Sequence, residues 1–141
     1  MGYSQNRPIK RGGIIVYEKN GHGLVVAPST LHPEWWDDAK IACDTLVLNG
    51  YSNWHLPTKK ELNSLYTAFT AGKIELIIES DFRSDGYLQY WSSTDDCVKN
   101  YPCNRAWWQS FDTSGENGAS PGQQDIHYKT KKFSVWCVRT F

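Results

Sequence analysis

The sequence has no long run of apolar residues. No stretch approaches the roughly 18 to 20 consecutive apolar residues that a membrane-spanning helix needs. The first residues, MGYSQNRPIKRGG, also lack the apolar stretch of a secretory signal. We therefore expect no membrane insertion, and either that the chain is not exported through such a signal or that a leader has been removed.

The sequence also lacks an excess of charge of either sign. Lys plus Arg and Asp plus Glu number 15 each, so the formal net charge is +0. A balanced chain has no long-range field that would gather a nucleic acid or an anionic bilayer. We expect no nucleic-acid partner, and a polyanion would need a local cationic patch.

CxxC motifs are absent too, although the chain has four cysteines, Cys43, Cys97, Cys103 and Cys137. Zinc ribbons and thioredoxin-like sites are therefore not supported. An even number of cysteines beside a single Met predicts two disulfides, and hence an extracellular, cell-surface or virion location. The alternative is four reduced, partly buried thiols.

Aromatic residues are abundant, with seven Trp and eight Tyr in 141 residues. A chain of this length and composition can bury one core. We expect a flexible N-terminal segment at 1–11 and a single domain at 12–141.

The first expected element is a hairpin. Residues 12–17 and 23–28 are short runs rich in β-branched residues, and Asn20-Gly21 between them suits a tight turn. Because both runs are nearly continuous apolar, we expect this strand pair in the middle of a sheet.

Two helices should follow. The first is expected over 33–48, with Pro33 in its first turn. Its buried stripe contains Trp36, Ala39, Cys43, Leu46 and Val47. Thr58 and Glu61 have the spacing of a capping box and predict a second helix that ends at Gly72. Tyr51 and Trp54 lie between the helices, so we expect them in the core rather than in a ligand site.

The second half of the chain predicts strands and polar loops. Residues 73–90 fit either a helical turn or a strand, and 90–94 (YWSST) fit a strand. Residues 105–115 predict a strand with aromatics on both faces. The last residues, FSVWCVRTF, predict one closing strand with Val135, Cys137 and Arg139 on one face.

Four cysteines allow three disulfide connectivities. Cys43 faces inward on the first helix and Cys137 lies on the closing strand. The most economical pairing joins these two and leaves Cys97 with Cys103.

Several blocks together resemble a known family. They are RGGIIVYEKNGHGLVVAP, a helix with Trp36, Asp38, Ala39 and Cys43, then LNGYSNWHLPTKKELNSLY, YWSST, a Trp-Phe strand and VWCVRTF. From about Gly12 to Phe141 the chain resembles the C-terminal domain of collagen-like bacterial surface proteins. That family is similar to the formylglycine-generating-enzyme branch of the C-type lectin fold. The resemblance implies an α+β, C-type lectin-like fold, with two short helices on a small, mostly antiparallel sheet and long polar loops.

The resemblance also implies a surface adhesion domain. Some members bind sulfated polysaccharides and many are trimeric, and similar folds occur in phage receptor-binding proteins. This chain has no Gly-X-Y repeat, which removes the evidence for a trimer. It also lacks the Glu-Pro-Asn, Gln-Pro-Asp and Trp-Asn-Asp motifs of calcium-dependent sugar-binding lectins.

We expect a shallow ligand site on two loops, 95–104 and 112–132, because recognition residues usually lie on loops held by a rigid scaffold. The expected ligand is a glycan or polyanionic polysaccharide, and the expected partner is a glycan or a host surface receptor, with a homo-oligomer such as a trimer as a further candidate. Trp107 or Trp108 offers a flat face to a sugar ring, and Lys129, with Lys131 and Lys132 nearby, can meet its anionic groups. Hydrogen bonds are expected from Asp112, Glu116, Asn117, Asp125 and His127.

Each of these residues also has a structural alternative. One Trp is needed in the core, carboxylates are commonly solvated, and lysines keep an edge strand from pairing. We expect no cofactor. A calcium ion among Asp95, Asp96, Asn104 and Asp112 is a weaker candidate, because no EF-hand spacing supports it.

Two other function classes compete with ligand binding. One is a structural or assembly domain at the tip of a phage fibre or pilus. The other is an enzyme of the formylglycine-generating type, with Cys97 and Cys103 as reactive thiols. Because Asp95 and Asp96 beside these cysteines do not favour a thiolate, we expect no enzymatic activity.

Overall fold

The computed structural model describes residues 9–75, 88–114 and 119–141. Within these described residues, three strands come first, two helices follow, and five strands come last. The strands are β1 (Ile14–Lys19), β2 (His22–Val26), β3 (Leu31–Glu34), β4 (Gln89–Asp96), β5 (Arg105–Ser110), β6 (Gln124–Tyr128), β7 (Phe133–Val135) and β8 (Val138–Thr140), and the helices are α1 (Trp36–Asp44) and α2 (Lys59–Thr70). Among the described residues, no helix has the length and apolar character needed to cross a membrane.

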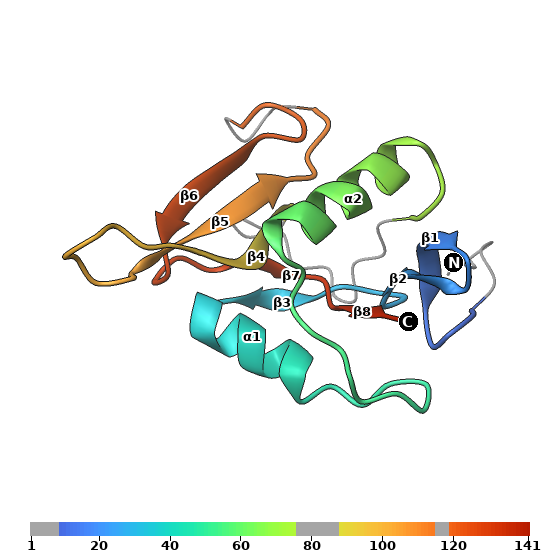
Figure 1. The fold of residues 1–141 in the computed structure, drawn as a ribbon. Helices are drawn as coiled ribbons and strands as arrows, with labels where there is room; N and C mark the ends of the chain where they lie inside the picture. The colour runs from blue at the N-terminus through green and yellow to red at the C-terminus, as the bar shows by residue number, and fades with distance from the viewer. Residues whose placement is uncertain (1–8, 76–87, 115–118) are drawn as a thin grey trace.

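The strands form two small sheets. One has the order β1-β2-β8 and the other β3-β7-β4-β5-β6. All named strand pairs are antiparallel except β4 with β7. Helix α2 packs on β4 and β5, and α1 packs on β3 and β4. Figure 1 shows the two helices on opposite sides of the five-stranded sheet. The predicted α+β class, with two short helices on mostly antiparallel strands, is confirmed.

The predicted N-terminal hairpin is present, with one correction. Asn20 and Gly21 have φ angles of 55° and 81°, as a tight hairpin turn requires. However, only β2 is an interior strand, because β1 lies at the edge of its sheet. The edge position agrees with the exposed second half of β1, where Tyr17 is 50% exposed.

Pro33 does not begin the first helix. It lies in β3, an outer strand of the five-stranded sheet, and α1 begins only at Trp36. A residue without a backbone N–H is tolerated at a sheet edge. The predicted helix start at Pro33 was wrong. Pro suits the first turn of a helix as well as a sheet edge, so the residue alone does not distinguish the two.

Helix α1 also ends earlier than predicted, at Asp44 instead of Leu48. The buried stripe is confirmed for Trp36, Ala39 and Cys43. Leu46 is half-buried, but Val47 is 71% exposed because it follows the end of the helix.

The corner between the helices holds core aromatics, as predicted. Thr58 and Glu61 form the capping box, with each side chain accepting a hydrogen bond from the other residue's backbone N–H. Trp54 is 2% exposed, and its indole N–H donates to the Tyr51 carbonyl oxygen. The guanidinium carbon of Arg139 lies 3.7 Å from the centre of the half-buried Tyr51 ring.

Strand β6 lies inside the segment that was expected to be a loop. It pairs antiparallel with β5. Its sequence, QDIHY, contains one aliphatic residue and lies at a sheet edge, mostly exposed. Because neither face of β6 is buried, its sequence has no alternation of apolar and polar residues from which a strand could be predicted.

The closing strand is in fact two strands in different sheets, β7 and β8. Trp136 and Cys137 separate them, and both side chains are buried. The Trp136 indole N–H donates to the Ala27 carbonyl oxygen at 2.8 Å. Val135 and Arg139 are buried as well, but they lie in different sheets, so the prediction of one continuous strand was wrong.

The predicted disulfide pairing is confirmed. Cys43 is bonded to Cys137 and Cys97 to Cys103, with Cα–Cα distances of 5.4 and 4.5 Å. The first bond joins α1 to the segment between the two closing strands. Because it closes a long loop, it stabilises the fold by about 4 to 5 kcal/mol on the loop-entropy estimate.

Two predictions fall outside the described residues. Residues 76–87 contain most of the segment for which helix and strand were both open. Residues 1–8 contain most of the expected flexible N-terminus. The single domain over 12–141 stays a prediction.

Candidate ligand-binding pocket

The cysteine loop, residues 97–103, connects β4 to β5 and is closed by the disulfide between its two ends. The flanking residues Asp96 and Arg105 are paired in the sheet, which holds both ends of the loop. Inside the ring, the Tyr101 N–H donates to the Val98 carbonyl oxygen. A short covalent ring has few conformations, so its side chains are presented in a preformed arrangement.

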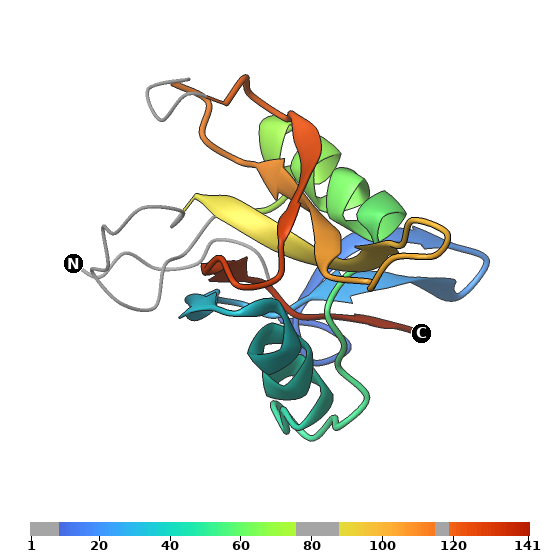
Figure 2. The same cartoon turned by 90° about the vertical axis from the view of Figure 1, so that its left-hand side faces the viewer.

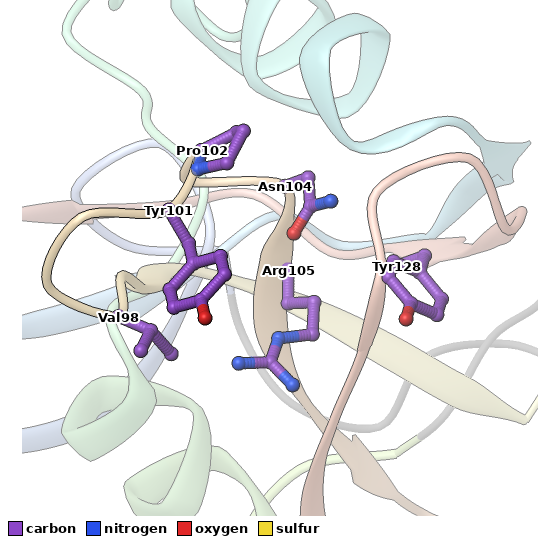
Figure 3. A pocket seen from close by; sticks show the side chains of 6 residues that line it. All are labelled: Val98, Tyr101, Pro102, Asn104, Arg105 and Tyr128. Carbon is purple, nitrogen blue, oxygen red and sulfur yellow. The ribbon is translucent and has the colours of Figure 1, made fainter.

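A hollow of about 290 Å³ lies between the cysteine loop and the end of β6. It is lined by Val98, Tyr101, Pro102, Asn104, Arg105 and Tyr128. Figure 3 shows Tyr101 and Tyr128 on either side of Arg105. The β5–β6 register explains this arrangement in part, because Arg105 is paired directly with Tyr128. The volume is close to the lower end, roughly 300 Å³, of small-ligand pockets.

The hollow is surrounded by exposed apolar side chains. Tyr101 is 72% exposed, Tyr128 56% and Val98 42%. A gathering of such side chains marks interaction sites more than a single exposed residue does. Each tyrosine offers a flat apolar ring and a hydroxyl group that can exchange hydrogen bonds.

Arg105 supplies a positive charge in this hollow. Its Nη2 atom lies 3.2 Å from Oδ2 of Asp96, and its side chain is 32% exposed. The contact engages one of the five N–H donors of a guanidinium directly. An anionic group of a ligand can therefore approach Arg105 from the solvent side.

Lys129, predicted as a ligand contact, lies behind the cysteine loop. Its ammonium group donates to Oδ2 of Asp95 at 2.8 Å and to the Cys103 carbonyl oxygen at 2.6 Å. It also lies 3.9 Å from the centre of the Trp36 ring, and its side chain is 16% exposed. These contacts join the loop to the end of β6 and to α1. The ammonium group of Lys129 is therefore paired with groups of the protein itself.

The two predicted tryptophans lie on opposite faces of β5. Trp107 is half-buried, with the Lys59 ammonium group 3.5 Å from its ring centre. Trp108 is 9% exposed and packs on Phe133. Neither residue lines the hollow.

The predicted polar residues are dispersed. Asp112 is 8% exposed and accepts hydrogen bonds from the backbone and hydroxyl of Ser114. Asp125 and His127 are exposed on β6, where the His127 ring packs against Phe133. Glu116 and Asn117 lie outside the described residues.

The four proposed calcium ligands are not brought together. Asp95 and Asp96 pair with Lys129 and Arg105 at one end of β5. Asp112 follows the opposite end of that strand. A cation bound by all four residues is therefore not favoured by this arrangement.

Sequence reasoning selected the loops 95–104 and 112–132, which contain Tyr101 and Tyr128, but it named neither tyrosine nor Arg105 as a site residue. The signal for the first loop was a polar segment between two cysteines. Arg105 and Tyr128 are far apart in sequence and meet through β6, which was not predicted.

The described fold and pocket define a small α+β domain whose disulfide-closed loop presents the exposed Tyr101 near the exposed Tyr128 of β6. Residues 14–139 match the Lcl C-terminal domain family, so the chain belongs to this family. The Lcl C-terminal domain is a domain of surface proteins. The predicted resemblance to the C-terminal domain of a surface-protein family is confirmed, while the relation to the formylglycine-generating branch stays a prediction.

The chain is also similar to the crystal structure of botrocetin. The two share 14% sequence identity with a TM-score of 0.44, over 89% of this chain and 95% of botrocetin. This likeness bears on neither ligand nor mechanism. Among curated proteins, none matches the chain.

Proposed function

We propose that this domain is a non-enzymatic ligand-binding module of an extracellular, cell-surface or virion protein. Its ligand is an acidic glycan, bound in the hollow beside the cysteine loop. The observation that carries the proposal is the position of Arg105 between the exposed rings of Tyr101 and Tyr128.

The chemistry of these three side chains matches an acidic sugar. A guanidinium group pairs with carboxylate or sulfate through two parallel hydrogen bonds. Tyrosine rings provide apolar surface for the C–H faces of a sugar and hydroxyls for its polar edge. A neutral sugar would leave Arg105 with its internal partner Asp96 alone, so the pocket favours an anionic ligand.

The cysteines support a binding module over a thiol enzyme. All four are paired in disulfides, so a cysteine-dependent reaction would require prior reduction of Cys97–Cys103. Calcium is not part of the proposal, because the contact residues are an arginine and two tyrosines.

The test is binding of heparin, hyaluronan and dextran to the immobilised domain at low salt. We expect binding to at least one of the two acidic polymers and none to neutral dextran. Arg105→Ala should weaken binding tenfold or more, since hydrogen bonds to charged groups contribute about 1.5 to 3 kcal/mol each. Tyr101→Ala and Tyr128→Ala should each weaken it by about two- to tenfold.

Tyr17→Ala is the matched control. The exposed fraction of Tyr17, 50%, is similar to that of Tyr128, 56%. Tyr17 lies on β1 beside a different hollow. Its loss should leave glycan binding unchanged. Equal binding of dextran, or full binding by the Arg105→Ala variant, would contradict the proposal.

An assembly domain is the second candidate, and one observation favours it. The edge strand β1 lies beside a hollow of about 240 Å³ formed with α2 and lined by Tyr17, Asn63 and Thr67 among others. Edge strands are common sites of pairing between chains. Sedimentation of the isolated domain tests this candidate. A trimer that Tyr17→Ala dissociates would support assembly, and a monomer at all concentrations would exclude self-assembly through β1.

A further inference from the structure

Trp35 differs from the other tryptophans of the chain. It is 51% exposed. All seven tryptophans lie in the described residues, and of the other six Trp107 is half-buried and Trp36, Trp54, Trp91, Trp108 and Trp136 are buried. An exposed indole gives up part of the favourable free energy of burying a large apolar side chain, so a role in stability does not account for it.

The local structure does not require an indole at this position either. Trp35 is the N-cap residue of α1, and its side chain makes no capping hydrogen bond. Ser, Thr, Asp and Asn are the residues that stabilise this position. Trp35 thus occupies a site where a smaller polar residue would serve the helix better.

Charged residues of both signs lie near Trp35, one in space and two in the adjoining sequence. The Lys132 ammonium group lies 5.0 Å from the Trp35 ring centre. Asp37 and Asp38 are exposed in the first turn of α1. Such an aromatic face with a cationic donor nearby suits the ring of a sugar and its oxygens.

Trp35 is close to the hollow beside the cysteine loop. The Lys129 backbone N–H donates to the carbonyl oxygen of Asn104, and its own carbonyl oxygen accepts from the N–H of Trp36. Since Tyr128 precedes Lys129 and Trp35 precedes Trp36, standard bond lengths place the Cα atoms of Tyr128 and Trp35 within about 12 Å of each other. Figures 1 and 2 show the cysteine loop, the turn after β6 and the start of α1 at the same end of the molecule.

We infer that Trp35 and Lys132 form a second sugar subsite for the same glycan chain. This inference rests on the proposed function of the hollow. The acidic unit binds at Arg105, and a neighbouring ring of the chain packs on Trp35 while Lys132 donates to its oxygens. The domain would therefore recognise an extended acidic oligosaccharide rather than a terminal sugar, and affinity would increase with chain length.

The test uses size-defined heparin and hyaluronan oligosaccharides, from the disaccharide to the octasaccharide, titrated into the wild-type domain and two variants. Trp35→Ala should weaken octasaccharide binding by about two- to tenfold and leave disaccharide binding unchanged. Arg105→Ala should weaken both. Ile41→Ala is the matched control, because Ile41 is 58% exposed on α1, and it should alter neither.

The outcomes separate the two proposals. If Arg105→Ala weakens both ligands but Trp35→Ala weakens neither, the second subsite is wrong and the hollow stands. If Trp35→Ala weakens both equally, Trp35 acts on the hollow itself and the second subsite is also wrong. If Arg105→Ala has no effect while Trp35→Ala reduces octasaccharide binding, the proposed function of the hollow is wrong and Trp35 cannot be a second subsite beside it. If the wild type binds no oligosaccharide of either series, both are contradicted.

Discussion

The ammonium group of Lys129 donates a 2.6 Å hydrogen bond to the carbonyl oxygen of Cys103. This bond fixes the end of the cysteine loop against the turn after β6. The same ammonium group contacts Asp95 and the face of Trp36. One side chain therefore joins the pocket wall to the five-stranded sheet and to α1.

Replacing Lys129 by Met should destabilise the domain by about 1 to 3 kcal/mol, because Asp95 and the Cys103 carbonyl lose a charged donor. Glycan affinity should fall together with the unfolding temperature. Lys99→Met, in the exposed part of the same loop, should change neither. A Lys129→Met variant that keeps wild-type stability and loses binding would instead support the direct ligand contact expected from the sequence.

Trp54→Ala should cost about 3 to 5 kcal/mol of unfolding free energy, since it removes a buried indole from the core. Denaturant unfolding followed by circular dichroism measures the loss. Trp35→Ala is the contrasting variant, because its exposed indole should change stability by less than about 1 kcal/mol. Similar losses in both variants would contradict the assignment of Trp54 to the core.

The two disulfides should differ in effect. The double variant Cys43→Ala/Cys137→Ala should lose about 4 to 5 kcal/mol, whereas Cys97→Ala/Cys103→Ala should lose about 2 kcal/mol because its loop is short. Only the second variant should lose glycan affinity out of proportion to stability, since it frees Val98 and Tyr101 from the ring. Unfolding and binding measurements on both variants test this, and unchanged binding after removal of Cys97–Cys103 would count against a preformed pocket.

Stability should depend on the pair His55–Glu61, whose side chains are 3.0 Å apart. The hydrogen bond with Glu61 raises the pKa of His55 above its ordinary 6.5, although burial opposes this. Burial alone would raise the pKa of Glu61, but hydrogen bonds from His55 and Thr58 outweigh it and lower the pKa below its ordinary 4.5.

The stability contributed by His55 is thus complete below pH 6.5 and is lost as pH rises through its raised pKa. The stability contributed by Glu61 is complete above pH 4.5 and is lost as pH falls through its lowered pKa. We expect the pair to stabilise the domain most between these two values. His55→Gln should reduce the difference in unfolding temperature between pH 5.5, where His55 contributes fully, and pH 8, above its ordinary pKa. If the unfolding temperatures of the wild type and of His55→Gln change equally between these two pH values, the pair does not have this role.

Features set by neighbouring residues were predictable from the sequence. The Thr58–Glu61 capping box and the Asn20-Gly21 turn depend on groups only a few residues apart, and both are present. The pairing of Cys43 with Cys137 was also predictable, because Cys43 was expected to face inward and Cys137 to lie on the closing strand.

Strand pairing that depends on distant segments of the chain was not predictable. Strand β6 has no buried face and exists because β5 offers it a hydrogen-bonded edge. The chain end breaks into two strands because each has a different sheet to join. The pocket shares this dependence, since Arg105 meets Tyr128 only through β6.

The most direct test of the central claim is an NMR titration of the isotopically labelled domain with a heparin or hyaluronan octasaccharide. The account predicts the largest chemical-shift changes in the cysteine loop, at Arg105 and at Tyr128. Changes concentrated instead around Tyr17 and α2, or no changes with either glycan, would contradict it.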